Sequence, residues 1–289
     1  MRRRTSPVRW PPGSTSGAAA VPSTTCGHGE GGKPSVDVAS AYAFEARHPE
    51  KVRDVSGSSG ALTARLDADD GCYYLKSGEA GSLRREYEAL RFFHPLGLAP
   101  EALGYESGER DCLLMRPLPG SPAVSSQLMS HPDRLARALG RALRDFHDRG
   151  IGDCPFSNSA ADMLARVERN HRARELDEVM ARAIGETDID RIYERIRAGA
   201  RLLEDDVVVH GDFCLPNVFF DGEYRFTGFI DLGMAGRGDR HYDLYWGRWT
   251  LRYNLGTDAY GDAFFDAYGA ADIDPARIEV AGLVSCLDG

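Results

Sequence analysis

The residues from Val207 to Gly233 include the side chains of this sequence best suited to chemistry. The segment reads VVVHGDFCLPNVFFDGEYRFTGFIDLG: a strand-like run leads to His210-Gly211-Asp212, Asn217 follows five residues later, and another apolar run ends at Asp231. Asp221-Gly222-Glu223 is expected to form a turn between two short strands. If those strands pair, Asn217 at the start of the first lies beside Asp231 at the end of the second, with Asp212 as their neighbour.

This set of oxygen atoms predicts a phosphoryl-transfer site. The Asp231 carboxylate and the Asn217 amide oxygen are hard ligands that suit Mg²⁺, which usually keeps several waters and completes its shell with substrate phosphates. Asp212 is then placed to accept a proton from an attacking hydroxyl. Phosphoryl transfer needs such an arrangement, because the work of the protein is to position the nucleophile and the phosphates and to neutralise charge.

Residues upstream are predicted to hold the nucleotide. Lys76, at the end of a strand-like run, could bind the phosphates, and Glu86, facing inward from the next helix, could fix that lysine as an ion pair. A small-residue loop that contains Ser58 and Ser59 could cover the phosphates with backbone N–H groups and hydroxyls. The Arg116-Pro117-Leu118 segment would offer backbone groups to the adenine edge.

Most of these residues also have purely structural interpretations. A lone strand-end lysine such as Lys76 is often a solvated charge, a helical glutamate such as Glu86 often belongs to a surface ion pair, and Ser-Gly loops are commonly plain turns. His210 is expected to brace its loop, because Asp212 already supplies the base. Asp243 could cap its helix or brace the catalytic loop. The H-G-D-x-x-x-x-N run, followed by a strand that ends in I-D, is the more specific signal.

Short strands and one helix are expected to carry Lys76 and Glu86. A strand at 61–66 and a returning strand at 72–76 would form a hairpin around the turn at 67–71, and further strands are expected near 102–106 and 111–115. Residues 82–94 have helical spacing, with Ser82 as the expected N-cap.

Beyond residue 116 the pattern becomes mainly helical. Prolines and a glycine interrupt the chain at 117–122, and helices are expected at 131–149, 159–183, 187–203 and from Asp243 onward. The sequence therefore predicts an α+β protein. Its parts would be a disordered low-complexity tail at 1–36, a small β-rich N-terminal nucleotide-binding lobe at 37–116 and a larger, mainly helical C-terminal catalytic lobe at 117–289.

Charge and composition narrow the class of protein. The 289 residues include 35 Lys and Arg against 44 Asp and Glu, a net charge of −9. The first 34 residues carry +4, so the remainder carries −13, which argues against a nucleic-acid partner. No run is long and apolar enough to span a membrane. Six scattered cysteines without C-x-x-C pairs suit a reducing cytoplasm, with Cys214 expected to be a buried thiol. We expect a monomer or weak dimer.

The motifs resemble those of the aminoglycoside phosphotransferases, and most closely the 3′-phosphotransferase (kanamycin kinase) branch, over residues 50–285. The resemblance rests on several segments: His210-Gly211-Asp212-Phe213 with Asn217, Gly228 to Gly233, Gly236 to Arg240 with Tyr242-Asp243, Asp153 to Phe156 after the helix that ends Phe146-His147, and Leu114-Met115. It implies a protein-kinase-like two-lobe fold, ATP, Mg²⁺ and transfer of the γ-phosphate to a hydroxyl, the 3′ hydroxyl in that branch, conferring resistance.

The resemblance also implies a role for each matching residue. Asp212 would be the catalytic aspartate, Asn217 and Asp231 the metal ligands, and Lys76 with Glu86 the phosphate-binding pair, and Ser58 and Ser59 would lie in the nucleotide loop. The small-molecule substrate would be an aminoglycoside, a polycation that an acidic cleft would attract. The candidate walls of that cleft are acidic residues between the long helix and the catalytic loop, most of which could equally lie on solvated helix faces: Asp153, Asp162, Glu175, Asp177, Glu178 and Glu186.

Two departures from the family pattern concern the substrate. Met234 stands where the family often has arginine, a cation that Arg237 or Arg240 could replace. The segment Val284–Gly289 has Asp288 as its one acidic side chain, where the 3′ enzymes have an acidic, aromatic tail. A streptomycin 3″-kinase, a metabolite kinase of the choline or thiosugar type, and a non-catalytic binding protein for drug or nucleotide are therefore kept as alternatives.

Overall fold

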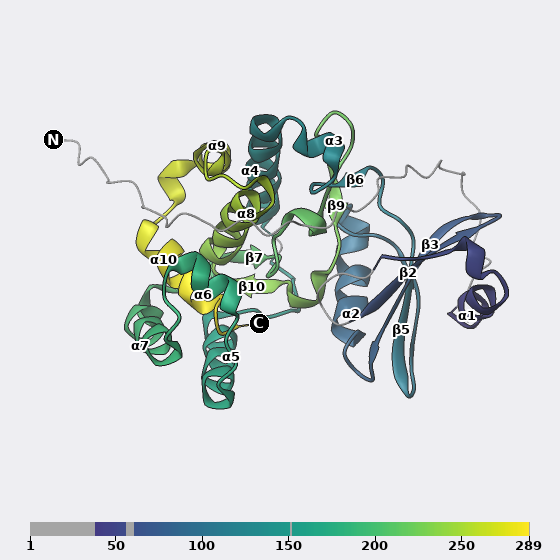
Figure 1. Ribbon diagram of the computed structural model, residues 1–289, viewed down its shortest axis with the longest axis horizontal. Helices are drawn as coiled ribbons and strands as arrows, with labels where there is room; N and C mark the ends of the chain where they lie inside the picture. The colour runs from purple at the N-terminus through teal and green to yellow at the C-terminus, as the bar shows by residue number, and fades with distance from the viewer. Residues whose placement is uncertain (1–37, 56–60, 151, 289) are drawn as a thin grey trace. The chain divides into compact units, whose positions relative to one another are not determined.

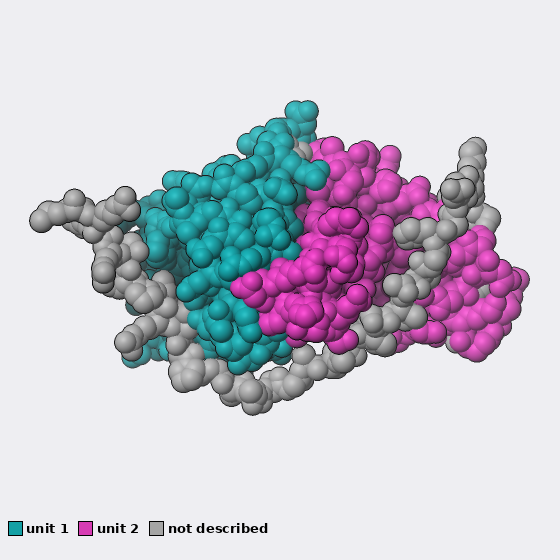
Figure 2. Space-filling view, turned by 90° about the horizontal axis from the view of Figure 1, so that it is seen from above, with its two compact units in different colours: residues 1–18, 136–213, 235–289 teal, residues 19–135, 214–234 magenta. Residues whose placement is uncertain are grey.

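The computed structural model describes residues 38–55, 61–150 and 152–288 (Figure 1). Two compact units are distinguished in Figure 2: unit 2 contains the residues up to Leu135 together with Cys214–Met234, and unit 1 contains Ala136–Phe213 and the residues from Ala235 onward. The predicted tail at 1–36 and the predicted loop residues Ser58 and Ser59 lie outside the described residues. The predicted lobe boundary between residues 116 and 117 stays a prediction.

Unit 2 is built on a five-stranded antiparallel sheet. In the order β1-β2-β3-β5-β4, its strands are β1 (Val52–Asp54), β2 (Leu62–Ala68), β3 (Gly71–Glu79), β5 (Arg110–Met115) and β4 (Ala102–Ser107). The four predicted strands are confirmed, and β1 is an addition. The turn between β2 and β3 is shorter than predicted, because Ala68 and Gly71 already pair across the hairpin.

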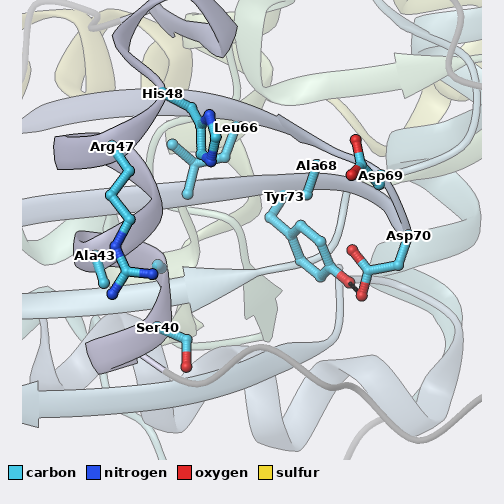
Figure 3. A pocket seen from close by; sticks show the side chains of 10 residues that line it. Ser40, Ala43, Arg47, His48, Leu66, Ala68, Asp69, Asp70 and Tyr73 are labelled. Carbon is cyan, nitrogen blue, oxygen red and sulfur yellow. Dashed lines mark hydrogen bonds between the residues drawn. The ribbon is translucent and has the colours of Figure 1, made fainter.

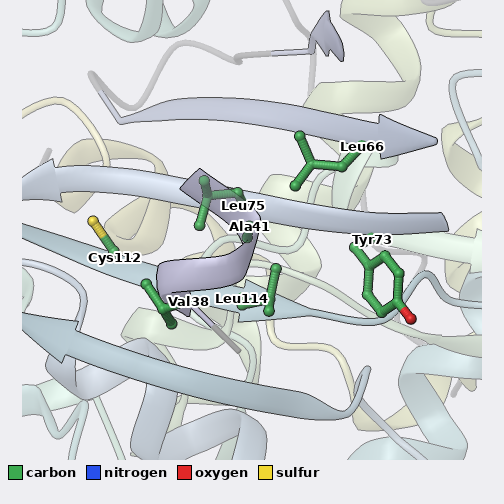
Figure 4. Packing of buried hydrophobic residues seen from close by; sticks show 7 residues of the cluster. All are labelled: Val38, Ala41, Leu66, Tyr73, Leu75, Cys112 and Leu114. Atoms are coloured by element: carbon green, nitrogen blue, oxygen red, sulfur yellow. The ribbon is translucent and has the colours of Figure 1, made fainter. Parts of the chain in front are cut away.

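Helices cover both faces of this sheet. Helix α1 (Val38–Arg47), which the sequence did not predict, packs its buried Val38 and Ala41 against a cluster from the strands (Figure 4): Leu66, Tyr73, Leu75, Cys112 and Leu114. Side chains alternate along a strand, so Lys76 and Gly78 of β3 point to the opposite face from Tyr73 and Leu75. Helix α2 (Arg84–Phe93) lies on that second face and buries Leu90 and Phe93.

The start of α2 differs from the prediction. The N-cap residue is Leu83, and the Ser82 hydroxyl donates to the Glu79 carbonyl oxygen at 2.7 Å instead of capping the helix. The Leu83 N–H group donates to the carboxylate of Asp111 in β5 at 2.9 Å, so the helix is capped by a side chain from the sheet. Sequence spacing favours a local cap, and this partner lies 28 residues away.

A second, three-stranded sheet in unit 2 has the order β6-β8-β9, with β6 (Ser121–Pro122), β8 (Val218–Phe220) and β9 (Phe226–Phe229). Strands β8 and β9 are antiparallel and pair Val218 with Phe229, which confirms the predicted hairpin around residue 222. Helix α3 (Ser126–Met129) follows β6.

Unit 1 is mainly helical. Helix α4 (Pro132–Asp148) leads into it, and its other helices are α5 (Ala160–Ala173), α6 (Glu178–Ile184), α7 (Ile189–Gly199), α8 (Arg240–Leu255), α9 (Gly261–Tyr268) and α10 (Pro275–Val284). Its strands β7 (Val207–Val209) and β10 (Gly236–Gly238) pair antiparallel.

Both units also contain short 3-10 helices, at Pro49–Lys51, His94–Leu96, Ala200–Leu202, Leu215–Asn217, Leu232–Met234 and Ala270–Asp272.

Two predicted helices of unit 1 have different bounds. The helix predicted at 159–183 is two helices, because Arg174 ends α5 in the left-handed conformation, with φ of 59°, and Asp177 caps a new helix with its carboxylate. Helix α8 begins before Asp243, because the carboxylate of Asp239 accepts a hydrogen bond from the backbone N–H of His241 and caps it.

Candidate active site

A buried lysine in unit 2 joins the predicted nucleotide residues to a predicted metal ligand. The Nζ atom of Lys76 lies 2.7 Å from Oε2 of Glu86 and 3.1 Å from Oδ1 of Asp231. The side chains of Lys76 and Glu86 are only 9% and 6% exposed, whereas that of Asp231 is 33% exposed. The expected ion pair is therefore present, and the interpretation of Lys76 as a solvated surface charge is excluded.

The charges around Lys76 keep it protonated. Burial lowers the pKa of Lys76, but the negative charges and hydrogen bonds of Asp231 and Glu86 outweigh burial and raise it above its ordinary value. The pKa of Glu86 is raised above its ordinary value, because burial and the charge of Asp231 outweigh the opposing effect of Lys76. The cluster thus holds a fixed positive charge between two carboxylates, one enclosed and one facing outward.

The pairing of β8 with β9 brings Asn217 and Asp231 to neighbouring positions, as predicted. Beyond the last paired residues, the backbone N–H of Ile230 donates to the carbonyl oxygen of Asn217 at 3.0 Å. Asp231 has a φ of 59°, in the left-handed region that residues other than glycine seldom adopt. Such a conformation costs free energy and is typical of sites where a side chain must point in one direction.

The segment predicted to contact adenine lies beside the second sheet of unit 2. A Cβ atom on Gly228 of β9 would come within 2.8 Å of a methyl carbon of Leu118, so the leucine rests on the strand backbone. The backbone N–H of Arg116 donates to the carbonyl oxygen of Glu101 at 2.9 Å, and Pro117 has no N–H. Leu118 is therefore the residue of these three whose backbone N–H could reach a ligand.

The loop that contains Asp212 is fixed by buried groups of unit 1. The carboxylate of Asp243 in α8 accepts hydrogen bonds from the backbone N–H groups of His210 at 2.6 Å and Gly211 at 2.9 Å. The backbone N–H of Asp212 donates to Nδ1 of His210 at 3.2 Å. His210 and Asp243 are both fully buried. Both residues brace the loop, the role expected for His210 and one of two left open for Asp243.

A further histidine supports Asp243. Nε2 of His147, in α4, lies 3.3 Å from Oδ2 of Asp243, and its Nδ1 lies 2.9 Å from the hydroxyl of Tyr268 in α9. The sequence singled out His147 only as the end of a long helix. A histidine at the end of an apolar helical stripe indicates a buried polar contact, so the sequence did contain a signal for this role. It could not identify the partners of His147, which are 96 and 121 residues away in the chain.

Comparison with known proteins identifies the family. The model of the phosphotransferase enzyme family matches residues 51–280. The chain belongs to this family.

Several relatives and solved structures similar to this chain have the names of aminoglycoside or streptomycin kinases. It is 38% identical over 233 residues to a probable aminoglycoside 3′-phosphotransferase of Lactococcus lactis subsp. lactis (strain IL1403), covering 80% of this chain and 88% of the relative. It is 32% identical over 210 residues to a streptomycin 3″-kinase of Streptomyces griseus, covering 65% and 73%. The crystal structure of an aminoglycoside-3′-phosphotransferase of type VIII matches with a TM-score of 0.70 and 26% identity, covering 85% and 96%.

These similarities confirm three predictions made from the sequence. The resemblance to the aminoglycoside phosphotransferases, the α+β kinase-like fold class and phosphoryl transfer as the reaction are all established by the family match and by the structural similarity. None of the helices in the described residues is both long and apolar enough to cross a membrane.

Most of the acidic residues proposed as walls of a drug cleft cap helices or make ion pairs and hydrogen bonds within unit 1. Asp162 belongs to the capping box of α5, and Asp177 caps α6. Glu178 pairs with Arg182 one turn along α6, and Glu186 accepts from the backbone N–H groups of Thr187 and Asp188, both at 3.0 Å. Asp153 and Glu175 are exposed, so they remain candidates for a wall of the drug cleft.

Two of the residues that were considered with the departures from the family pattern are bonded within unit 1. Arg240 donates to Asp206 at 2.7 Å, so it is bound within unit 1. Asp288 is only 6% exposed and accepts from Arg166 and, at 2.9 Å, from the Tyr242 hydroxyl. This carboxylate is therefore part of the core of unit 1 and not a free acidic tail. Cys214 is half-buried, which corrects the expectation of a buried thiol.

A pocket of about 550 Å³ opens elsewhere in unit 2, between α1 and the hairpin of β2 and β3 (Figure 3). Its lining includes Arg47, His48, Asp69, Asp70 and Tyr73, and the Tyr73 hydroxyl donates to Asp70 at 3.1 Å. None of the residues predicted from the sequence to do chemistry lines this pocket.

Proposed function

We propose that this protein is an aminoglycoside 3′-phosphotransferase that transfers the γ-phosphate of ATP to the 3′ hydroxyl of the drug and so confers resistance. The observation that carries the proposal is Lys76 held between Glu86 and Asp231 in a chain of the phosphotransferase enzyme family. A buried lysine ammonium group beside a partly exposed carboxylate suits the binding of a polyphosphate.

In this proposal Lys76 binds the nucleotide phosphates and Glu86 orients it. The phosphates would replace Asp231 as the second anionic partner of the ammonium group, while the shorter contact to Glu86 remains. Leu118 would offer its backbone N–H to the adenine edge. Ser58 and Ser59 are proposed to cover the phosphates.

Asn217 and Asp231 fit a Mg²⁺ ion by the chemistry of their donor set. One carboxylate and one amide oxygen at the adjoining ends of β8 and β9 are enough, because Mg²⁺ usually keeps several waters and takes its other ligands from substrate phosphates. When bound, Mg²⁺ would neutralise charge on the phosphates. In this proposal the left-handed backbone of Asp231 would direct its carboxylate towards the ion.

Asp212 is the proposed base that accepts the proton of the attacking hydroxyl. Asn217 follows it by five positions, and even a fully extended chain of that length keeps the two Cα atoms within about 18 Å of each other. Asp243 and His210 hold the loop through its backbone, and in this proposal the Asp212 carboxylate takes the proton of the substrate hydroxyl. Fixing the base before the substrate arrives lowers the entropic cost of the reaction.

The substrate assignment is tested by measuring phosphate transfer from ATP to a panel of 4,6- and 4,5-linked aminoglycosides. We expect transfer to drugs that have a 3′ hydroxyl and none to a matched 3′-deoxy drug. Transfer to the 3′-deoxy drug at a similar rate would refute the 3′ assignment while leaving a kinase. Drug-susceptibility profiling of a sensitive host that expresses the protein tests resistance directly.

The similarity to a streptomycin 3″-kinase, at 32% identity, favours streptomycin as a second candidate substrate. Asp288, the one acidic side chain where the 3′ enzymes have an acidic, aromatic tail, is buried and gives the 3′ assignment no support. Including streptomycin in the panel separates the two, because a 3″-kinase would phosphorylate streptomycin and leave the 4,6-linked drugs unchanged.

We also infer that the protein acts in the cytoplasm as a monomer or weak dimer, without nucleic acid as a partner. No disulfide joins the five cysteines in the described part of the chain, which suits a reducing compartment. The acidic balance of the chain suits a cationic drug and opposes binding to a polyanion.

A further inference from the structure

Asp111, which no sequence motif singled out, is a buried carboxylate with several hydrogen-bond donors. It lies in β5, is fully buried, and accepts from the hydroxyl of Ser107 at 2.6 Å, the hydroxyl of Tyr105 at 2.8 Å and the backbone N–H of Leu83 at 2.9 Å. An isolated carboxylate would be costly to bury, so these donors are what allows it to stay charged inside the protein.

The hydrogen bonds of Asp111 reach from the sheet to the first turn of α2. Asp111 is paired in register with Gly78 of β3, and a Cβ atom on Gly78 would come within 2.5 Å of the Ser82 hydroxyl and 3.3 Å of Leu83 Cγ. The start of the helix therefore lies directly on β3. The charge of Asp111 at this end also interacts favourably with the helix dipole.

Lys76 and Glu86 form a second attachment between the same strand and the same helix. Lys76 lies two residues before Gly78 on β3, so both face α2, and Glu86 follows Leu83 by three residues, about one helical turn. The ring of Tyr105 stacks on that of Tyr87 in α2, with centroids 5.1 Å apart, and its hydroxyl bonds Asp111. The contacts of Asp111 therefore fix α2 about one helical turn before Glu86.

We propose that Asp111 is a positioning residue that holds the first turn of α2 on the sheet and thereby keeps Glu86 against Lys76. Asp111 touches no substrate in this account. It acts through the helix: without its carboxylate the Leu83 N–H loses its acceptor, the first turn loosens, and the contact between Glu86 and Lys76 lengthens. The inference rests on the proposed function, in which Lys76 binds the nucleotide phosphates.

Equilibrium binding of ATP to the full chain, together with steady-state kinetics, tests this inference. We expect Asp111→Ala to weaken ATP binding and raise the KM for ATP by about tenfold, with the KM for the aminoglycoside changed by less than about twofold. Asp111→Asn keeps one acceptor oxygen and should recover most of the affinity. Asp274→Ala is the matched control, because Asp274 caps α10, which holds no proposed site residue, and this variant should bind ATP like the wild type.

A double-mutant cycle separates positioning from general stability. If Asp111 acts through Glu86, adding Asp111→Ala to Glu86→Gln should weaken ATP binding by less than about twofold further. Full additivity of the two effects, or unchanged ATP binding in Asp111→Ala, would overturn the inference. If Asp111→Ala does not fold, Tyr105→Phe removes one donor, keeps the stacked ring, and should show a smaller shift in the same direction; normal ATP binding in that variant would contradict it.

The outcomes also distinguish this inference from the proposed function. A wild-type protein that does not bind ATP would refute the proposed function itself. A wild type that binds ATP, with Asp111→Ala binding it equally well, would leave the proposed function intact and remove only the role of Asp111.

Discussion

At the scale of single residues, Lys76 contributes to both stability and activity. Its ammonium group is the hydrogen-bond partner of the buried Glu86. Replacing Lys76 with methionine leaves a carboxylate buried without its partner, and we expect the free energy of unfolding to fall by about 3 kcal/mol. Denaturant unfolding measures this loss.

The same residue allows stability and activity to be separated. The double variant Lys76→Met with Glu86→Gln should regain part of the lost stability, because no unpaired charge is buried, yet it should not regain phosphate transfer. A double variant that is no more stable than Lys76→Met alone would contradict the buried-pair account.

Asp111 predicts a specific pH dependence of stability. Burial raises its pKa, but hydrogen bonds from Ser107, from the backbone of Gly81 and Leu83 and from Tyr105 outweigh burial and lower the pKa to about 2. A carboxyl group with a lowered pKa stabilises the fold above its unfolded pKa of about 3.9, and this contribution is lost as the pH falls towards 2. Near neutral pH, the free energy of unfolding of the wild type should therefore be about 1 to 2 kcal/mol higher than that of Asp111→Asn.

Denaturant unfolding of both proteins at several pH values measures that difference. We expect it to be constant above about pH 5 and to shrink between about pH 4 and pH 2. A difference that does not change with pH would show that the Asp111 carboxylate is not held in its charged form.

At the scale of elements, the loop that begins at His210 depends on α8. The Asp243 carboxylate accepts from two loop N–H groups and contacts His147. Asp243→Asn keeps one acceptor oxygen and places an amide N–H₂ where the other was, so one donor loses its partner, at a cost of about 1 to 3 kcal/mol. We expect a lower kcat with little change in the KM for ATP, measured by steady-state kinetics. Unchanged kcat would show that the loop does not need this brace.

Local pattern was enough to predict the elements that present the site. The alternation at 61–66, the apolar run ending at Lys76 and the two runs around residue 222 each satisfy their hydrogen bonds with a near neighbour in the chain, so β2, β3, β8 and β9 were predicted correctly. The convergence of Asn217 with Asp231 followed from pairing two strands across a short turn, which is a local inference.

The features that were missed depend on distant partners. Helix α1 has a weak apolar pattern and is fixed by packing on β2, β3 and β5. The cap of α2 comes from Asp111. The break between α5 and α6 depends on a left-handed conformation of Arg174, which cannot be predicted from an arginine in the sequence. The acidic residues of that region were proposed as cleft walls, because a count of charges cannot tell a cap or an ion pair from a binding surface.

At the scale of the whole molecule, the acidic balance predicts a dependence on salt. Residues 35–289 carry a net charge of −13, and a polycationic drug would be attracted to them at low ionic strength. We expect the KM for the aminoglycoside to rise about three- to tenfold between roughly 50 and 500 mM salt. A neutral acceptor sugar is the control. A KM for the drug that does not change with salt would remove electrostatic attraction from the account.

The central claim is that this chain transfers phosphate from ATP to an aminoglycoside with Asp212 as the base. The most direct test is transfer of labelled γ-phosphate to a 3′-hydroxylated aminoglycoside, measured for the wild type and for Asp212→Ala, with melting temperatures recorded for both. The account predicts phosphorylation at the 3′ position by the wild type, and loss of at least about 99% of the rate in a variant that melts normally. Full activity in Asp212→Ala, or no transfer by the folded wild type, would contradict it.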